Sequence, residues 1–286
     1  MKAAMGQIKV RDATVAGIFY PDDPSELEER IDALLEAARP AVTGAKAILA
    51  PHAGLDYSGD LSALAWKSAA GREIDTVLVL SPLHRAEESV IYLPESDYFE
   101  MPTGRAIVDR DAVADLHDSG TLMRVNDIPH LEEHGIELQL PFMLALFPEA
   151  RLVPILLGKP TASTVKALSL ALSMAFADRA DSTLVVISSD LGSSSDERVA
   201  EAYADSFLSG FLKGDAKDLL EALRASERDG GDGACACGSG CSAAYLMSGL
   251  RGSARACLLG RHDSSASRET GEERLVHYAA VALADG

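Results

Sequence analysis

The fold class can be argued outward from one stretch of the chain, Ala47-Ile-Leu-Ala-Pro-His-Ala-Gly-Leu-Asp-Tyr-Ser-Gly59. The stretch opens with an apolar run, and a proline and a histidine follow directly. Short apolar runs bounded by glycine and proline are typical of buried strands. The pattern predicts a strand with His52 just past its carboxyl end, a turn framed by Gly54 and Gly59, and a helix over 60–70.

Two later segments repeat this arrangement. The buried run 75–80 is followed by Ser-Pro-Leu-His84, and the run 182–188 leads into Asp190. In open α/β sheets the carboxyl ends of parallel strands meet at one edge, where ligands bind. We therefore expect His52, His84 and Asp190 to lie in one site.

The rest of the chain predicts strands that alternate with helices. Further strands are expected at 89–93, 105–108, 122–125, 151–157, 254–259 and 276–283. Helices are expected from Asp22 onward and at 110–118, 130–147, 163–177, 197–212, 216–225 and 242–250, with a loop at 98–104. The first helix should pack its apolar face on a sheet. Alternating strands and helices indicate a mostly parallel sheet covered on both faces. No linker rich in proline or glycine divides the middle, so the chain predicts one α/β domain over 1–286, a three-layer α/β/α sandwich.

Composition and charge narrow the classes of function. The chain has 286 residues, of which 47% are apolar, enough for a substantial core. Its net charge of −18 argues against a nucleic-acid partner, because phosphate backbones need a basic face. The start lacks the apolar region of a signal peptide, and no apolar run reaches the roughly 18 residues of a membrane span. We expect a soluble cytoplasmic protein without a membrane partner.

Metal binding is the chemistry that these residue types favour. Two imidazoles at one sheet edge can hold a divalent metal ion with a third ligand from Cys, Asp or Glu. Three cysteines lie close together, Cys235, Cys237 and Cys241, while Cys257 stands alone. A four-thiolate site would need a second group of cysteines, which this sequence lacks. One thiolate that joins the histidines as a ligand would favour iron, copper or zinc over magnesium. The alternative is that the cysteines are simply small buried side chains.

A second pattern, His130-Leu-Glu-Glu-His134, matches the inverted zinc-protease motif. On a helix, His130 and His134 would share a face, and Glu133 could serve as the base. Pro129, however, places His130 at the helix boundary. Of the remaining histidines, His117 and His277 are interpreted as structural, and His262 is left open.

Several segments together resemble the Memo family, which is related in fold to class III extradiol ring-cleaving dioxygenases. They occur in the family's order along nearly the whole chain: Ala16-Gly-Ile-Phe-Tyr-Pro21, Pro51-His-Ala-Gly-Leu-Asp-Tyr-Ser-Gly59, Ser81-Pro-Leu-His84, Met101-Pro-Thr-Gly104, Glu133-His-Gly-Ile-Glu-Leu-Gln-Leu-Pro-Phe142, Ser188-Ser-Asp190 and Cys237-Gly238. The resemblance implies an α/β fold with a cleft at the strand ends.

The resemblance also implies roles for individual residues. A metal ion, Fe(II) first with copper or zinc as alternatives, is expected on three ligands: His52, His84 and Cys237. Residues beside the metal are expected to position substrate or move protons: Asp190, His134 and Glu133. Two more are expected to bind substrate: Tyr57 and Ser193. In the related dioxygenases a carboxylate stands where this chain offers a thiolate.

Two positions depart from the family pattern. The family usually has a histidine three residues after the aspartate of Ser-Ser-Asp, aligned with the catalytic base of the dioxygenases, and here Ser193 stands there. A serine cannot take up a proton near neutral pH as an imidazole can. Gly135 replaces the serine expected after His134. The metal site can persist while the base is lost, or His134 takes over the role of the base.

Three functions follow as hypotheses. The first is a dioxygenase-like, metal-dependent oxidoreductase that acts on a small organic substrate. The second is a non-catalytic adaptor that binds a metal or a peptide. The third is a zinc-dependent hydrolase, which would need His130 as a ligand. The expected partner is a small molecule or a peptide, and a homo-oligomer is compatible with the sequence.

Overall fold

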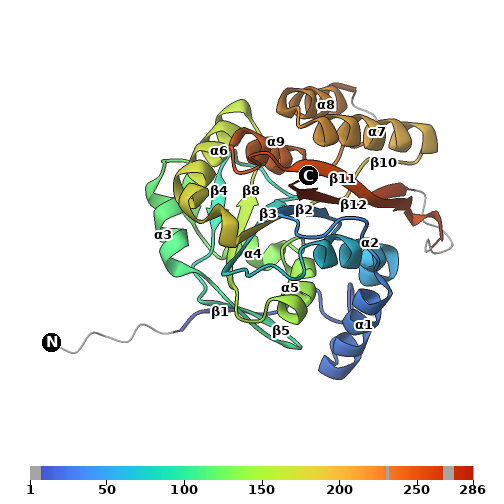
Figure 1. Cartoon of the computed structure of the whole chain (residues 1–286). Helices are drawn as coiled ribbons and strands as arrows, with labels where there is room; N and C mark the ends of the chain where they lie inside the picture. The colour runs from blue at the N-terminus through green and yellow to red at the C-terminus, as the bar shows by residue number, and fades with distance from the viewer. Residues whose placement is uncertain (1–7, 230–231, 267–273, 286) are drawn as a thin grey trace.

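Four parallel strands form the centre of the main sheet in this computed structural model, which describes residues 8–229, 232–266 and 274–285 (Figure 1). In spatial order they are β2 (Ala47–Ala50), β9 (Thr183–Ser188), β3 (Thr76–Pro82) and β8 (Arg151–Leu157). All four are almost wholly buried, as expected for strands covered on both faces. Their parallel direction brings their carboxyl ends to one edge.

The outer strands make the sheet mixed. Strand β12 (Leu275–Ala284) runs antiparallel to β2 and also pairs with β10 (Ser193–Ser194) and β11 (Arg255–Asp263). At the other side β4 (Ile91–Leu93) runs antiparallel to β8 and parallel to β7 (Met123–Val125). The predicted mostly parallel central sheet is confirmed, with antiparallel pairing toward its edges.

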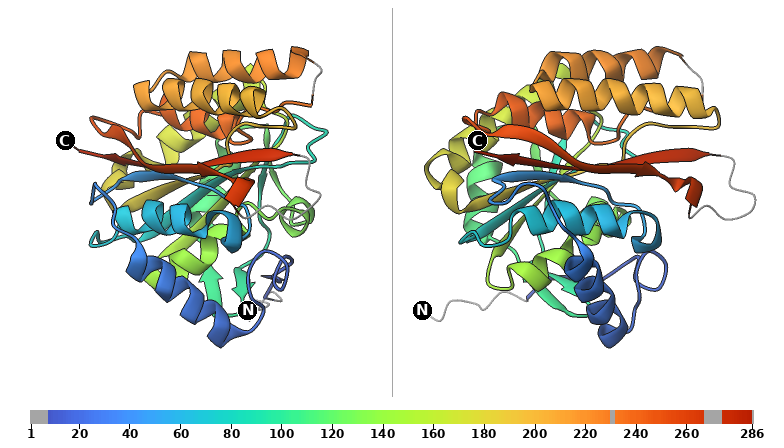
Figure 2. Two further views of the ribbon diagram at one scale, coloured as in Figure 1. Left: turned by 90° about the vertical axis from the view of Figure 1, so that its right-hand side faces the viewer. Right: turned by 45° about the vertical axis from the view of Figure 1, so that its right-hand side comes forward.

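Helices cover both faces of this sheet, as Figure 2 shows. One side carries α1 (Pro24–Ala37), α2 (Leu55–Ser68) and α5 (Leu140–Leu146). The other carries α3 (Arg110–Asp118), α6 (Ala162–Phe176), α7 (Glu197–Lys213), α8 (Ala216–Asp229) and α9 (Ser239–Met247). The three-layer α/β/α arrangement is therefore confirmed. The expectation that α1 packs on the sheet is wrong, since its buried face lies chiefly against α2 and α5.

Helix α2 begins earlier than predicted. It starts at Leu55, directly after Gly54, so Gly59 lies inside the helix and does not belong to a turn. A side chain at Gly59 would place its Cβ 3.0 Å from Cδ1 of Leu34 on α1. The second glycine thus permits close packing of two helices, which a turn-based interpretation of glycine overlooks.

The helix predicted over 130–147 is broken into pieces. Helix α4 (Ile128–Glu132) ends where Glu133 adopts an extended backbone, and a 3₁₀ turn (Glu137–Gln139) precedes α5. Pro141 lies in the first turn of α5, because proline lacks the N–H needed inside a helix but is tolerated at a helix start. The break replaces the continuous helix that the zinc-protease pattern requires.

A small second sheet contains β1 (Val10–Arg11), β5 (Tyr98–Met101) and β6 (Gly104–Ile107). The loop predicted over 98–104 is wrong, because residues 98–101 form β5, paired antiparallel with β6. The buried side chains of Phe99 and Met101 alternate with less buried neighbours, which is the period of a strand.

Among the described helices, none has both the length and the apolar character that a membrane span requires.

Candidate metal centre

The ends of three central strands deliver polar residues to one point. His52 follows β2, His84 follows β3 and Asp190 follows β9. The rings of His52 and His84 lie 5.0 Å apart between centroids, and the backbone N–H of His52 donates to Oδ1 of Asp190 over 2.9 Å. The predicted convergence of these three residues is confirmed, because β2, β9 and β3 are adjacent and parallel.

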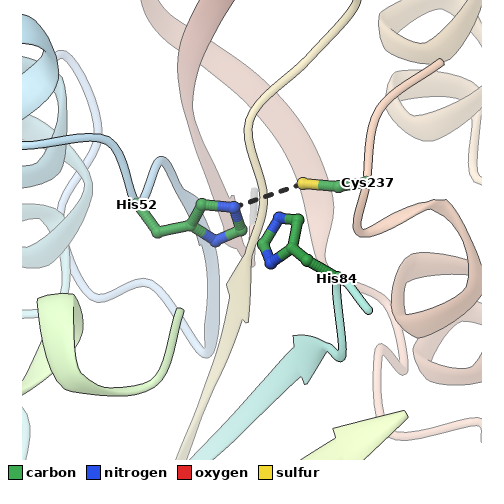
Figure 3. Close-up of side chains that lie close together, drawn as sticks. All are labelled: His52, His84 and Cys237. Carbon is green, nitrogen blue, oxygen red and sulfur yellow. Dashed lines mark hydrogen bonds between the residues drawn. The ribbon is translucent and has the colours of Figure 1, made fainter. Parts of the chain in front are cut away.

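Cys237 completes a group of three potential metal ligands. Its sulfur lies 3.3 Å from Nε2 of His52, and the potential ligand atoms of His52, His84 and Cys237 lie within 4.8 Å of one another. Figure 3 shows the two rings and the sulfur turned toward one another. The thiol is partly buried at the entrance to α9. Two imidazoles and a thiolate are the donor set of an iron, copper or zinc site.

The orientation of His52 follows from a chain of buried hydrogen bonds. The Trp66 indole N–H donates to Oε1 of Gln139 over 2.9 Å, so the amide NH₂ of Gln139 faces Oγ of Ser188 at 3.1 Å. The Ser188 hydroxyl donates to the carbonyl of Gly135 over 2.6 Å. Ser188 Oγ must therefore accept from Nδ1 of His52, 2.8 Å away.

The consequence is a fixed tautomer of His52. With its proton on Nδ1, the ring presents the Nε2 lone pair to the Cys237 sulfur. Burial, reinforced by the charges of His84 and His134, holds the pKa of His52 well below its ordinary value. A neutral imidazole with a fixed tautomer is the form that ligates a metal ion.

Gly135 lets the chain come close to this ring. A Cβ at Gly135 would lie 2.3 Å from Oγ of Ser81 and 3.1 Å from Nδ1 of His52. The glycine at this position, where the sequence resemblance implies a serine, therefore belongs to the packing around His52.

Replacing Ser188 with alanine should weaken metal binding about 10–100-fold, the usual cost of losing a hydrogen-bond partner of a metal ligand. The substitution removes the acceptor that holds the Nδ1 proton of His52. Competition titration of the purified protein with a chromogenic chelator measures the apparent affinity. Ser68→Ala removes another buried hydroxyl, on α2, and should leave the affinity unchanged. Equal affinities in both variants would show that Ser188 does not orient the ligand.

Glu133 anchors the second histidine. Its buried carboxylate accepts from the backbone N–H of His84 over 2.8 Å and lies 3.0 Å from Nδ1 of His84. It also accepts from the backbone N–H groups of His134 and Gly135, and Nδ1 of His134 lies 3.0 Å away. Burial alone would raise the pKa of Glu133, but bonds from His134 and His84 outweigh it and lower the pKa far below its ordinary value. A carboxylate bound this fully orients histidines better than it accepts a proton.

The pKa of His84 is shifted in the opposite direction to that of His52. Burial alone would lower the pKa of His84, but the Cys237 sulfur and the Glu133 carboxylate outweigh burial and raise that pKa to about 11. With Nδ1 engaged by Glu133, Nε2 is the ring nitrogen that can bind a metal ion, and it must give up its proton to do so. Such carboxylate–histidine pairs are the usual support of histidine ligands.

A cavity of about 450 Å³ is lined by His134 and Asp190, which contact the ligand candidates, whereas neither His52 nor His84 belongs to its wall. The His134 ring, one of its walls, stacks on His84 at 4.8 Å and meets His52 edge-on at 5.2 Å. Asp190 forms another wall, and burial raises its pKa to about 6. The lining residues are Phe19, Ala53, Gly54, Tyr57, His134, Asp190, Ser264, Arg274, Val276 and Tyr278.

The two predicted substrate-binding residues are placed differently. Tyr57 lines the cavity, whereas Ser193 does not belong to its wall. The Ser193 hydroxyl instead accepts from Nε and Nη2 of Arg274 over 3.1 and 3.0 Å. Sequence reasoning missed Arg274, because 81 residues separate it from Ser193 and no local motif surrounds it.

His130 and His262 lie outside the group formed by His52, His84 and Cys237. His130 is buried against Phe99, and its carbonyl accepts from Arg11, so the pattern that pairs His130 with His134 on one helix face does not form. A zinc-hydrolase site that needs His130 as a ligand is thereby unsupported. His262 bonds to Asp60.

The remaining cysteines in the cluster are buried. Burial raises the pKa of the Cys235 and Cys241 thiols. They belong to neither of the two groups of potential ligands found among the described residues. The first group is His52, His84 and Cys237, and the second is His84, Glu133 and His134.

Comparison with known proteins agrees with the resemblance of the sequence segments. A family model described as Memo-like protein matches residues 11–282. A MEMO1 family protein of Pyrobaculum arsenaticum is 30% identical over 226 residues, which cover 75% of this chain and 79% of that protein. A MEMO1 family protein of Methanococcoides burtonii is 29% identical over 276 residues, with coverage of 95% and 99%. Protein MEMO1 of Xenopus tropicalis is 31% identical over 184 residues, with coverage of 63% and 61%. Since the family model spans nearly the whole chain, this protein belongs to the Memo family.

Proposed function

We propose that this protein binds a transition-metal ion through His52, His84 and Cys237 and acts as a dioxygenase-like oxidoreductase on a small organic substrate. The observation that carries the proposal is the convergence of Nε2 of His52 and the Cys237 sulfur beside His84, with all three potential ligand atoms within 4.8 Å of one another. The adjoining cavity supplies room for a substrate. Its volume lies within the range of small-molecule sites.

The donor set suits a transition metal. Both histidines have Nδ1 engaged by a protein partner, Ser188 for His52 and Glu133 for His84, which leaves Nε2 of each ring for the ion. A thiolate favours iron, copper or zinc over magnesium or calcium. We assign Fe(II) first, with copper and zinc as alternatives. When bound, such an ion with three protein ligands supplies open coordination positions and Lewis-acid or one-electron chemistry.

The protein's own residues would bind and orient the substrate. His134 and Asp190 lie in the wall of the cavity, next to the ligand histidines, where each can hold a hydrogen-bonding group of the substrate or transfer a proton. Glu133 would keep His84 and His134 in position. Phe19 and Tyr57 offer an apolar surface on which a ring can pack.

A non-catalytic adaptor that binds a metal or a peptide is the second candidate. The observation that favours it is the position of Ser193, where the family resemblance implies a histidine base. The Ser193 hydroxyl is held by Arg274 and cannot replace an imidazole as proton acceptor. In this function the same cavity would bind its ligand without turnover.

Oxygen consumption distinguishes the two functions. Protein purified without oxygen and loaded with ferrous iron should consume oxygen in repeated turnovers when catechols are added. The same protein loaded with zinc, which has no redox chemistry, is the control and should consume none. Absence of turnover in the iron-loaded protein, with the metal still bound and a peptide or small ligand bound tightly, would support the adaptor instead.

A further inference from the structure

Arg274 brings a positive charge to the cavity beside the metal centre. Arg274 is the one lysine or arginine among the residues that line this cavity in the described part of the chain. The remaining wall is largely aromatic or small and apolar, apart from Asp190, His134 and Ser264. An arginine in such a wall is a candidate for recognising the charge of a ligand.

The guanidinium of Arg274 is oriented by the backbone and side chain of Ser193. Nε and Nη2 donate to the Ser193 hydroxyl over 3.1 and 3.0 Å, and Nη2 also donates to the Ser193 carbonyl over 3.2 Å. These contacts hold one edge of the planar group. A guanidinium has five N–H donors, so donors on Nη1 remain for a ligand.

Besides the hydrogen bonds from Ser195, the positive charge of Arg274 contributes to the lowered pKa of the Asp232 carboxylate, but Arg274 and Asp232 form no salt bridge. Within residues 8–229, 232–266 and 274–285, Arg274 forms no salt bridge with a carboxylate, although Asp190 lines the same cavity. The cavity therefore presents a positive and a negative group that do not pair with each other. A ligand with one anionic end would be bound in one orientation, with that end at Arg274 and away from Asp190.

We propose that the ligand of this cavity is a small carboxylic acid with an aromatic body, whose carboxylate binds Arg274. A carboxylate oxygen can accept from Nη1 of Arg274, which Ser193 does not engage, and Phe19, Tyr57 and Tyr278 provide ring surfaces for the body. The proposal names the substrate class of the function proposed above and rests on that function for the identity of the binding site. Binding of the carboxylate to Arg274 itself needs no metal ion. Ser193 becomes the residue that positions Arg274.

Calorimetric titration with benzoate and benzamide tests the proposal, because the two probes share a ring and differ in charge. The metal-free protein should bind benzoate more tightly than benzamide. Arg274→Gln should weaken benzoate binding about 10–100-fold, the range expected for hydrogen bonds to a charged group, and leave benzamide binding unchanged. Arg274→Lys should recover part of the loss, and Ser193→Ala should weaken benzoate binding by a smaller factor, about 2–10-fold.

Controls separate this proposal from the proposed function. Arg255→Gln removes an exposed arginine on β11 outside the cavity wall and should change neither titration. Arg274→Gln should leave the metal content and the thermal midpoint unchanged. Four results would each overturn the carboxylate proposal. The native protein could bind both probes with equal affinity, bind neither at millimolar concentration, or bind inorganic phosphate more tightly than benzoate. Alternatively, Arg274→Gln could lose equal affinity for benzoate and for benzamide. Oxygen consumption that fails while benzoate selectivity persists would remove the oxidoreductase function alone.

Discussion

Protein that carries both His52→Ala and His84→Ala is expected to lose its metal ion, from about one per chain to a trace. The two substitutions remove two of the three proposed ligands, and losing only a supporting partner of one ligand already costs roughly 10–100-fold in affinity. The metal content of native and variant protein, purified in parallel without oxygen, can be measured by inductively coupled plasma mass spectrometry. The same measurement identifies the ion.

The control for this experiment is a double variant of the same chemistry, His117→Ala with His262→Ala, at histidines outside the metal group. It should retain the full metal content. His52 is buried, so its loss also removes one of the hydrogen-bond partners of Ser188 and can disturb folding. His84→Ala alone, at a side chain that is 36% exposed, keeps the test valid if the double variant is unstable. Equal metal content in the native protein and in His84→Ala would refute the assigned site.

Glu137→Gln is expected to destabilise the protein by about 3–5 kcal/mol, the cost of leaving a buried charge without its partner. The Glu137 carboxylate is fully buried, forms an ion pair with Arg11, and accepts from the backbone N–H groups of Thr14 and Val15 and from the Tyr20 hydroxyl. Arg11 in turn donates to the carbonyls of His130 and Glu133. The pair thereby fastens β1 to the segment that carries Glu133.

The loss of stability in Glu137→Gln should become smaller as the pH falls. Burial alone would raise the pKa of Glu137, but the charge of Arg11 and the Tyr20 hydroxyl outweigh burial and lower that pKa below its ordinary value of 4.5. A lowered pKa contributes stability above pH 4.5 that is lost as the pH falls through the folded-state pKa. The native protein should therefore lose this advantage over Glu137→Gln in acid.

Urea unfolding at pH 7 and at lower pH measures both effects. Glu221→Gln is the matched control, because Glu221 pairs with Lys217 on an exposed helix surface at 3.7 Å. Such a pair contributes roughly 0.5 kcal/mol or less. A Glu137→Gln variant as stable at pH 7 as the Glu221→Gln variant would show that the buried pair does not hold β1 in place.

Much of the fold could be predicted from local patterns. The bounds of the predicted helix at 110–118 and strand at 151–157 match α3 and β8, because their apolar periodicity and flanking residues are unambiguous. The segment 130–147 was not predictable in this way. Its apolar stripe has the period of a helix, yet the hydrogen bonds of Glu133 to His84 and the burial of Glu137 against Arg11 favour a broken path. Tertiary contacts outweighed helix propensity there.

The sequence by itself determined the central strands of the main sheet and the chemical nature of the candidate metal ligands, because buried apolar runs and their flanking polar residues are local features. It placed His52 and His84 at the ends of strands that pair in parallel with β9. Only the tertiary structure decided that the Cys237 sulfur meets His52 across 185 residues, that Glu133 anchors two histidines, and that Arg274 reaches the cavity. Those contacts join segments far apart in the chain, and their geometry depends on how the helices and strands pack around the sheet.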